Sequence, residues 1–300
     1  MDKKTIAVCG ATGKQGGAVV ESLLNRTQWN VIALSRNPEG IKAKELSARG
    51  VNIVKADLLD RASLMIVFKE VYGVFGVTQP FLNNSTKADP MMEIEQGHNI
   101  VDSCAEMGVK HLVLSTVFGN DNELTGVPHL DSKLKIVDYL RKSNVPYTVL
   151  KPSSFMDNIG SNFFPVRKGK IRGFIDRDVK VPYIATKDIG EFAALVFDNP
   201  ELYLREELNL VADLVSGDEL ARTFTKINKY RLYRYKAIPR LPMQLFAKEF
   251  YQMRVSFEKA GRPPLPEEYA LALKRCREIH PGMMDIEQFL VYKGYSVKKH

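Results

Sequence analysis

The chain has 300 residues, of which 45% are hydrophobic and 26% are charged, so it is long and apolar enough to bury a sizeable core. No apolar run reaches the roughly 20 residues of a membrane-spanning helix, which excludes that class of protein. The formal net charge of +8 lies mostly in residues 151–300, where 26 Lys and Arg stand against 19 Asp and Glu, and this excess suits either an anionic ligand or simple solubility.

Short apolar runs alternate with segments of helical period in the first half. The predicted strands are residues 5–9, 31–35, 51–55, 73–77, 111–115 and 147–150. The predicted helices are residues 16–26, 41–49, 61–71, 91–107 and 132–141. Continuous apolar strands that alternate with helices are typical of a parallel sheet covered on both faces. We therefore predict an α/β protein with a doubly wound parallel sheet.

The alternation weakens after residue 152. Strands are predicted at residues 181–184 and 207–211, with a helix at 187–197 between them. Ser216 is expected to cap a further helix together with Glu219, and the remainder reads as helical. We expect residues 1–158 to form the first domain and residues 159–300 a smaller α+β lobe, with residues 181–211 returning to the first domain.

A glycine-rich loop follows the first strand, where residues 9–17 read C-G-A-T-G-K-Q-G-G. Gly10 allows a sharp turn, Gly13 allows a pyrophosphate to approach the backbone, and Gly16 allows the helix to pack closely on the sheet. The free N–H groups at the helix start would face the phosphates. The predicted phosphate-binding residues are Gly10, Ala11, Thr12, Gly13, Lys14, Gln15 and Gly16.

The end of the second strand indicates which nucleotide binds. A carboxylate there would hold the ribose 2′-hydroxyl of NAD, but this strand ends in Ser35-Arg36-Asn37. Arg36 is placed for a 2′-phosphate, with Ser35 and Asn37 as hydrogen-bonding neighbours and Lys14 as a second cation. The predicted cofactor is NADP(H).

Further contacts are expected at the carboxyl ends of the next strands, where ligands of such sheets bind. Ala56 and Asp57 close the third strand. Asp57 could accept a hydrogen bond from the adenine amino group, or it could belong to the cap of the next helix. Thr78, Gln79 and Pro80 close the fourth strand and would line the ribose or the nicotinamide.

The combined motifs resemble the NmrA-like family, an atypical branch of the short-chain dehydrogenases and reductases. The motifs are the glycine loop, Ser35-Arg36-Asn37-Pro38, Lys133, residues 151–158 (K-P-S-S-F-M-D-N) and the stretch 230–239 (Y-R-L-Y-R-Y-K-A-I-P). The resemblance implies a Rossmann lobe, a smaller carboxyl-terminal lobe and NADP(H) as cofactor. It also places Lys133 and four residues after the sixth strand on the nicotinamide side: Ser153, Ser154, Phe155 and Met156.

The sequence departs from the superfamily at one catalytic position. Ordinary members use Tyr-x-x-x-Lys, in which the lysine lowers the tyrosine pKa, and a hydroxyl from the fifth strand polarises the substrate. Lys133 fits the lysine, and Ser115 or Thr116 fits the hydroxyl, but His129 stands where the tyrosine would be. His129 could act as a general acid beside Lys133, or it could simply mark the start of a helix.

Two functions follow from the resemblance. The first is a redox sensor or regulator that binds NADP(H) and a partner protein, with weak or no turnover. The second is an NADPH-dependent oxidoreductase that reduces a quinone or similar small apolar electrophile in a cleft between the lobes. Aromatic residues could wall that cleft: Phe155, Phe163, Phe164 and Tyr183.

Nucleic-acid binding is a third class. No acidic residue lies between Glu219 and Glu249, whereas eight Lys and Arg do, interleaved with Tyr230, Tyr233 and Tyr235. We expect instead an exposed edge strand with solvated cations, which protect an edge against unwanted pairing.

Metal chemistry and secretion are not expected. Cys9, Cys104 and Cys276 are far apart, without metal-ligand spacing, and read as reduced thiols. The remaining histidines are isolated: His98, His111, His280 and His300. The apolar first strand begins almost at once, so we expect no signal peptide and a cytoplasmic protein, with the nucleus as a second location.

Overall fold

The computed structural model describes residues 3–81, 88–119, 124–229 and 231–296. The chain forms two compact units. The first unit contains Met1–Lys151 and Thr186–Leu208, and the second contains Pro152–Ala185 and Asn209–His300. The sequence placed the boundary at residue 158 and the returning segment at residues 181–211, whereas in the structure the first unit ends at Lys151 and the returning segment is Thr186–Leu208.

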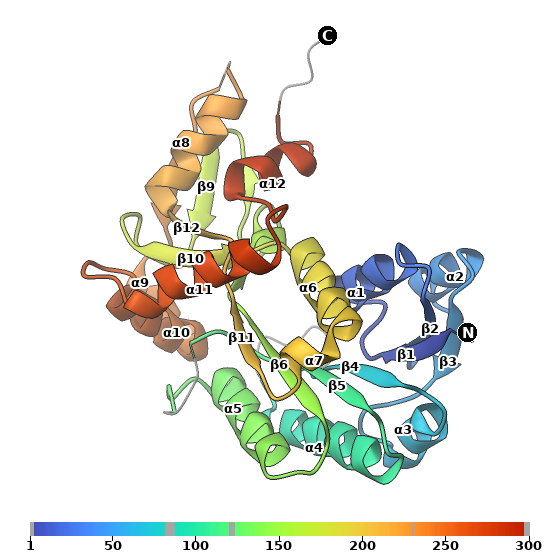
Figure 1. The fold of residues 1–300 in the computed structure, drawn as a ribbon. Helices are drawn as coiled ribbons and strands as arrows, with labels where there is room; N and C mark the ends of the chain where they lie inside the picture. Colours follow the sequence, from blue (N-terminus) through green and yellow to red (C-terminus); the bar gives the residue numbers. More distant parts are fainter. Residues whose placement is uncertain (1–2, 82–87, 120–123, 230, 297–300) are drawn as a thin grey trace. The chain divides into compact units, whose positions relative to one another are not determined.

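The first unit is built on a seven-stranded sheet with the order β11-β6-β5-β4-β1-β2-β3 (Figure 1). Its strands are β1 (Lys4–Val8), β2 (Trp29–Ser35), β3 (Asn52–Lys55), β4 (Gly73–Val77), β5 (His111–Ser115), β6 (Tyr147–Pro152) and β11 (Glu207–Leu210). The pairs from β3 through to β6 are all parallel. The predicted α/β fold with a doubly wound parallel sheet is confirmed, because helices bury both faces of these apolar strands.

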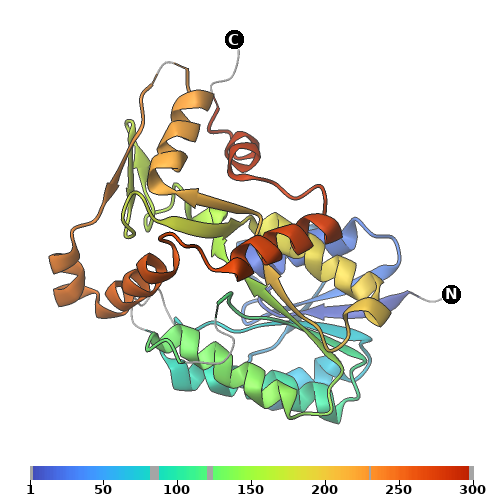
Figure 2. The ribbon, with the colours of Figure 1, turned by 60° about the vertical axis from the view of Figure 1, so that its left-hand side comes forward.

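Seven helices belong to the described part of this unit. They are α1 (Lys14–Leu24), α2 (Ile41–Ala48), α3 (Arg61–Phe68), α4 (Pro90–Glu106), α5 (Pro128–Arg141), α6 (Thr186–Asp198) and α7 (Pro200–Tyr203). Helices α1 and α6 lie side by side on one face of the sheet, and α3, α4 and α5 cover the other (Figures 1 and 2). Arg26, just after α1, reaches Asp198 of α6 at 2.6 Å and Glu191 at 3.1 Å.

Helix α5 begins four residues before the predicted start at Ser132. Pro128 occupies its first turn, where the missing N–H is not needed. The Asp131 carboxylate accepts hydrogen bonds from the Thr125 and Gly126 backbone N–H groups at 2.7 and 3.0 Å, which orders the entry to the helix. His129 and Lys133 therefore both lie on α5.

The second unit holds two three-stranded sheets, β12-β10-β7 and β13-β9-β8. Its strands are β7 (Ser154–Phe155), β8 (Val166–Arg167), β9 (Lys170–Gly173), β10 (Lys180–Ile184), β12 (Asp213–Ser216) and β13 (Arg234–Ala237). Its helices are the 3-10 turn Met156–Asn158, α8 (Gly217–Ile227), α9 (Arg240–Phe246), α10 (Lys248–Ala260), α11 (Glu267–Ile279) and α12 (Ile286–Tyr292). The predicted smaller α+β lobe is thus a mixed α and β unit.

Local sequence signals explain two features of this unit. The predicted capping box at the start of α8 is confirmed, since Ser216 and Glu219 each accept the other's backbone N–H. The predicted strand over residues 230–239 is shorter than expected, because β13 covers Arg234–Ala237. Tyr230 and His300 lie outside the described residues. No helix in the described ranges is long and apolar enough to cross a membrane.

Candidate functional site

Close contacts between backbone atoms shape the loop between β1 and α1. Gly10 has a φ of 62°, in the left-handed region that favours glycine, and its carbonyl accepts a hydrogen bond from the Gly13 N–H at 2.8 Å. A Cβ on Gly16 would lie 2.3 Å from the Gly10 carbonyl oxygen, so only glycine lets α1 pack this closely on the loop. The turn expected at Gly10 is confirmed, and the close approach expected at Gly16 is made against the backbone of the loop rather than against the sheet.

The start of α1 has the character of an anion site. Gly13 is the N-cap, and no side chain caps the helix there. The first turn holds no acidic residue, and its N–H groups have no intrahelical acceptor. These donors, together with the positive end of the helix dipole, suit negatively charged oxygens. The helix start has no side-chain cap, and the glycines of the loop leave room next to the backbone. Both features suit the pyrophosphate of a dinucleotide.

Side chains of neighbouring elements fix this loop. The Ser115 hydroxyl at the end of β5 donates to the Gln15 side-chain oxygen at 2.7 Å. The Lys42 ammonium donates to the Thr12 carbonyl at 3.2 Å. Because the Ser115 proton is engaged by Gln15, there is less reason to assign this residue the role of a carbonyl-polarising hydroxyl. Thr116 donates to the Leu150 carbonyl at 3.4 Å.

The tip of β2 carries the predicted 2′-phosphate residues. The buried Ser35 hydroxyl oxygen accepts a hydrogen bond from the Asn37 N–H at 3.2 Å and so shapes the turn. Arg36 and Asn37 are exposed. Among the described residues, no carboxylate pairs with the Arg36 guanidinium, so the cation is available to a ligand. Its assignment stays a prediction.

The end of β3 separates the two readings of Asp57. Asp60 is the residue that caps α3, since its carboxylate accepts the Ser63 N–H at 3.2 Å. The Asp57 carboxylate accepts the Leu59 N–H at 3.0 Å and closes a local turn. Ala56 is buried in the core. Asp60 is thus the N-cap residue, and Asp57 lies in the cap region before it, where its N–H donates to the Ser63 hydroxyl at 3.1 Å. Contact between Asp57 and adenine stays a prediction.

A buried polar cluster joins β4, α4 and α5, and we call Thr78, Glu93, Ser132 and Lys133 the Glu93 cluster. The Glu93 carboxylate is fully buried and accepts three hydrogen bonds. The Lys133 ammonium donates at 2.6 Å, the Thr78 hydroxyl donates at 2.8 Å, and the Ser132 hydroxyl donates to the second oxygen. Lys133 also donates to the Thr78 oxygen at 3.2 Å.

This arrangement accounts for a charge in the core. An ion that leaves water is tolerated only when its partner and hydrogen bonds replace the lost hydration. The Lys133 side chain retains 14% exposure, whereas Glu93 has none. The pair therefore holds the lysine ammonium at a fixed point beside the carboxyl end of β4.

Sequence reasoning missed Glu93 and Gln96, two polar residues on the buried side of α4. The Gln96 side-chain oxygen accepts the Gln79 N–H at 2.9 Å, and the Pro80 carbonyl accepts the Asp89 N–H at 2.8 Å. These bonds hold the predicted segment after β4 against the start of α4. The available signal was two polar residues three apart on a largely apolar helix face.

His129 lies in the first turn of α5 and is half-buried. Its ring packs against Phe81, with ring centroids 5.6 Å apart and planes tilted by 49°. Four residues further on, Lys133 is engaged by Glu93 and Thr78. Of the two predicted catalytic side chains, the structure thus places one in a buried ion pair and the other against an aromatic ring.

The four residues expected on the nicotinamide side lie in the second unit. They are Ser153, Ser154, Phe155 and Met156, in and around β7. The Ser153 N–H donates to the Leu210 carbonyl at 3.0 Å, while its buried hydroxyl has no hydrogen-bond partner among the described residues. Their contact with a cofactor stays a prediction.

The aromatic residues proposed for a pocket also belong to the second unit. Phe163 is 43% exposed, and its ring centroid lies 4.9 Å from that of Phe250 and 5.5 Å from that of Phe174. Phe164 is buried beside Tyr235. Burial raises the pKa of Tyr183, so its hydroxyl stays protonated near neutrality.

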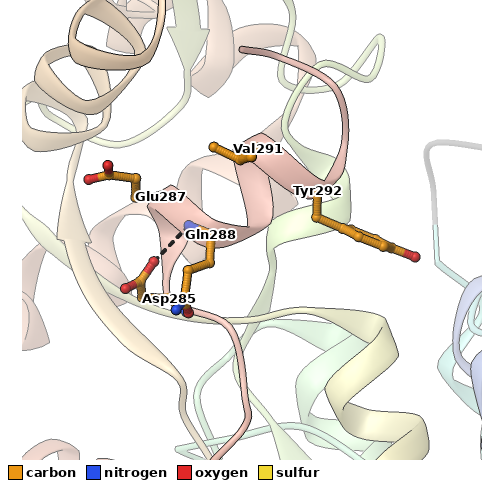
Figure 3. Close-up of a pocket in the computed structure, with 5 residues that line it drawn as sticks. All are labelled: Asp285, Glu287, Gln288, Val291 and Tyr292. Carbon is orange, nitrogen blue, oxygen red and sulfur yellow. Dashed lines mark hydrogen bonds between the residues drawn. The ribbon is translucent and has the colours of Figure 1, made fainter. Parts of the chain in front are cut away.

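A surface depression on α12 does not form a comparable site. Its lining is Asp285, Glu287, Gln288, Val291 and Tyr292 (Figure 3). All five come from one short helix and its cap, where Asp285 accepts the Gln288 N–H at 2.8 Å. The polar groups of Asp285 and Gln288 satisfy each other, and Tyr292 points away from them (Figure 3). Among the described residues, no group of three or more His, Cys, Asp or Glu could hold a metal ion.

The sequence is similar to a known protein family and to several of its members. The model of the NmrA-like family matches residues 2–290. An NmrA-like family domain-containing oxidoreductase, FrzB, of Cladobotryum sp is 30% identical over 253 residues, which is 74% of this chain and 73% of that protein. A Dictyostelium discoideum protein with an NmrA-like family domain is 29% identical over 77% of this chain and 80% of its own length.

Solved structures share the fold at lower identity. NmrA, a negative transcriptional regulator solved with NAD, superposes with a TM-score of 0.76 at 20% identity, over 96% of this chain and 94% of that one. The NADPH-dependent quinone oxidoreductase QOR2 of Escherichia coli, solved with NADPH, gives a TM-score of 0.76 at 20% identity, over 96% and 99%.

Proposed function

The chain belongs to the NmrA-like family, and from this premise we propose that it binds NADP(H) and acts chiefly as a sensor of that cofactor, with weak or no turnover. The uncapped start of α1 and the glycine loop support the binding of a pyrophosphate. Similar structures were solved with NAD, NADP and NADPH. Arg36, at the tip of β2 and without a carboxylate partner among the described residues, favours the 2′-phosphate form.

One observation carries the preference for a sensor. The Lys133 ammonium is neutralised by a fully buried carboxylate at 2.6 Å. In the catalytic pair of short-chain dehydrogenases, the lysine's positive charge lowers the pKa of a tyrosine. A balanced charge has little effect of this kind, and the neighbour on the same helix face is His129 rather than tyrosine. Proton transfer to a substrate is therefore poorly supported.

In a sensor, the chain's residues bind the cofactor and report its redox state. Glu93 holds Lys133 and Thr78 together, so a change in the ligand beside them would be felt by α4, α5 and β4 at once. A partner protein would respond if it prefers the protein bound to one redox form. The coupling free energy between cofactor and partner equals the difference in the partner's binding free energy between the NADPH-bound and the NADP⁺-bound protein.

The second candidate is an NADPH-dependent reductase of quinones or similar electrophiles. NADPH supplies a hydride when it is bound. A quinone needs little activation by a protein acid, so the neutralised Lys133 is no obstacle to this reaction. This candidate is favoured by the similarity to FrzB, which is named an oxidoreductase, and to QOR2, which is a quinone oxidoreductase.

NADPH oxidation with a panel of quinones and aldehydes separates the two candidates. Wild type is compared with Lys133→Ala and His129→Ala, and NADPH binding is titrated in the same samples by fluorescence. We expect tight NADPH binding and little turnover. Substantial quinone turnover in the wild type would establish the reductase, and its collapse in a variant that still binds NADPH would give that residue a catalytic role.

The choice of cofactor has its own test in Arg36→Ala. Loss of a charge-assisted contact to phosphate costs about 1.5–3 kcal/mol, so NADP(H) affinity should fall roughly 10- to 100-fold. NAD(H) affinity should stay nearly unchanged. Arg49→Ala is the matched control, because Arg49 is an exposed arginine paired with Glu21. Equal losses for NADP(H) and NAD(H) would remove the assignment of Arg36.

A further inference from the structure

The sheet β13-β9-β8 in the second unit exposes one face and buries the other. Figure 2 shows the light green hairpin of β8 and β9 beside the orange strand β13. Ile171 and Tyr235 point to the buried side, where the Tyr235 hydroxyl donates to the Ile175 carbonyl at 2.8 Å. We call the exposed positions the basic sheet face: Arg167, Lys170, Arg172, Arg234 and Lys236.

Strand register arranges these five cations in two rows. Arg167 lies opposite Lys170, and Lys170 lies opposite Arg234, so one row crosses all three strands. Arg172 lies opposite Lys236 in the second row. Neighbouring strands are ~4.8 Å apart, so the longer row is about 10 Å wide, and the rows are about 7 Å apart along the strands.

The chain segments that form the face carry no negative charge. Its strands come from residues 158–175 and 220–248, and neither stretch contains Asp or Glu. None of the five side chains has a carboxylate partner in the part of the chain that the structure describes. Other cations of the same unit do have one, as in the Arg177–Asp218 and Lys180–Glu219 pairs. The deficit of carboxylates is therefore local to this face.

Protection of a sheet edge does not explain the arrangement. β13 is an edge strand, as the sequence led us to expect, but Lys170 and Arg172 lie on the central strand β9. Like charges directly opposite each other destabilise a sheet. Solubility could be served by cations spread over the surface at no such cost. The concentration on one face instead suits a ligand with closely spaced negative charges.

We propose that the basic sheet face binds the phosphate backbone of duplex nucleic acid without sequence preference. A row about 10 Å wide is comparable with the ~12 Å major groove, so its two end arginines can reach phosphates on either side. Arginine also matches the geometry of phosphate oxygens. Each contact would release a counterion condensed on the duplex, which supplies the free energy of binding.

Two other anions fit the face less well. A single strand is held by stacking of its bases on aromatic side chains, and the described exposed positions of these strands carry none. An acidic peptide would gain little binding free energy from each exposed ion pair, and it would lose conformational entropy on ordering. An anionic bilayer attracts any basic surface and serves as the remaining alternative in the test.

Fluorescence anisotropy with a short labelled DNA duplex tests the proposal across a salt series, using the full chain. We expect a slope of log affinity against log salt of about −4, since five phosphate contacts give at most ~0.9 per contact. The double variant Arg172→Gln with Lys236→Gln removes the second row, and should reduce the slope by about 2. The variant should keep its Tm, because it removes a repulsive pair.

The matched control is Lys110→Gln with Lys142→Gln, which changes net charge equally at exposed lysines of the first unit. We expect the control to bind duplex like the wild type. If the two double variants lost the same duplex affinity, the binding would depend on net charge rather than on the basic sheet face, and the proposal would be overturned. Binding to phosphatidylserine vesicles or polyglutamate, with none to the duplex, would overturn it as well. The single variant Lys236→Gln, expected to lower the slope by about 1, repeats the test should the double variant fail to fold.

Discussion

The glycine loop and the Glu93 cluster lie in the same unit, but they keep their shapes by opposite means. The loop is made of backbone that approaches backbone, as where Gly16 meets the Gly10 carbonyl. The cluster is made of side chains from three separate elements that neutralise one buried charge. Adding a side-chain atom should therefore disrupt the loop, and removing a charge should destabilise the cluster.

Gly16→Ala should have the largest effect. The added Cβ would lie 2.3 Å from the Gly10 carbonyl oxygen and 2.5 Å from its carbon, so α1 would have to move away from the loop. We expect a loss of about 3 kcal/mol or more in the free energy of unfolding, together with the loss of NADP(H) binding. Urea denaturation and a binding titration measure the two effects.

Gly17→Ala is the control for this substitution. Its Cβ would lie 3.3 Å from the Ala11 carbonyl oxygen, a contact that a small shift relieves. Stability should fall by less than about 1 kcal/mol, since alanine also favours the helix. If both variants lose the same stability, close backbone approach is not what Gly16 provides.

Glu93→Gln should come next. The substitution leaves the Lys133 ammonium without its counter-ion, at a cost of about 3 kcal/mol, the lower end for a buried pair because the lysine keeps some exposure. Lys133→Met should cost at least as much, since it strands the fully buried carboxylate. Urea denaturation of each variant measures the free energy of unfolding.

A double-mutant cycle gives the sharper result for the cluster. Glu93→Gln combined with Lys133→Met removes both charges, so the double variant should be more stable than the sum of the single losses predicts, by about 2 kcal/mol or more. Additive losses of stability would mean that Glu93 and Lys133 have no interaction energy, which would contradict the assignment of an ion pair between them.

His111 shows a third way to keep a titratable group in the core, which is to leave it neutral. Thr148 gives its hydroxyl proton to the Tyr203 carbonyl at 2.6 Å, so the His111 Nε2 must donate to the Thr148 oxygen at 2.8 Å. Nδ1 has no partner among the described residues. Burial lowers the pKa of His111 from 6.5 to about 4, because the charged imidazolium would lose its hydration in the core.

Stability should consequently depend on pH through His111. Between pH 6.5 and about 4 the unfolded chain binds a proton that the folded protein does not, so this contribution is complete above pH 6.5 and is lost as the pH falls toward 4. Its full size is about 3 kcal/mol. Urea denaturation across this range should give a smaller pH dependence for His111→Gln than for wild type. Parallel curves would contradict the assignment.

Ser115→Ala should have the smallest effect. It removes the hydrogen bond that holds Gln15 from the end of β5, which is worth about 1 kcal/mol. Backbone alone would still form the loop, so NADPH affinity should fall only a few-fold. A loss as large as that of Gly16→Ala would show that side chains, too, determine the loop's shape.

The features that depend on residues close together in the chain could be predicted from the sequence. The strands of the main sheet were predictable, because strands buried on both faces read as continuous apolar runs. The glycine loop was predictable because Gly10, Gly13 and Gly16 act on one another within seven residues. The start of α5 was misplaced, since Asp131 caps the segment before the helix while lying inside it.

Features that depend on distant residues could not be predicted. Glu93 lies 15 residues from Thr78 and 40 from Lys133, and an acid within a helix usually reads as a solvated position. The pairing of β9 with β13 joins Lys170 to Arg234 across a long stretch of other elements. Both segments are visibly basic in the sequence, but nothing local to either one shows that they pair in the same sheet.

The late return of the chain to the first unit constrains how the protein matures on the ribosome. Strand β11 completes a sheet whose other six strands end by residue 152, and helix α6 completes the helical layer beside α1. Until residue 198 has left the exit tunnel, the face of α1 that packs on α6 stays exposed, and until residue 210 has left it, the β6 edge lacks its neighbour. Nascent chains stalled before that point should recruit chaperones, and those stalled well beyond it should resist protease.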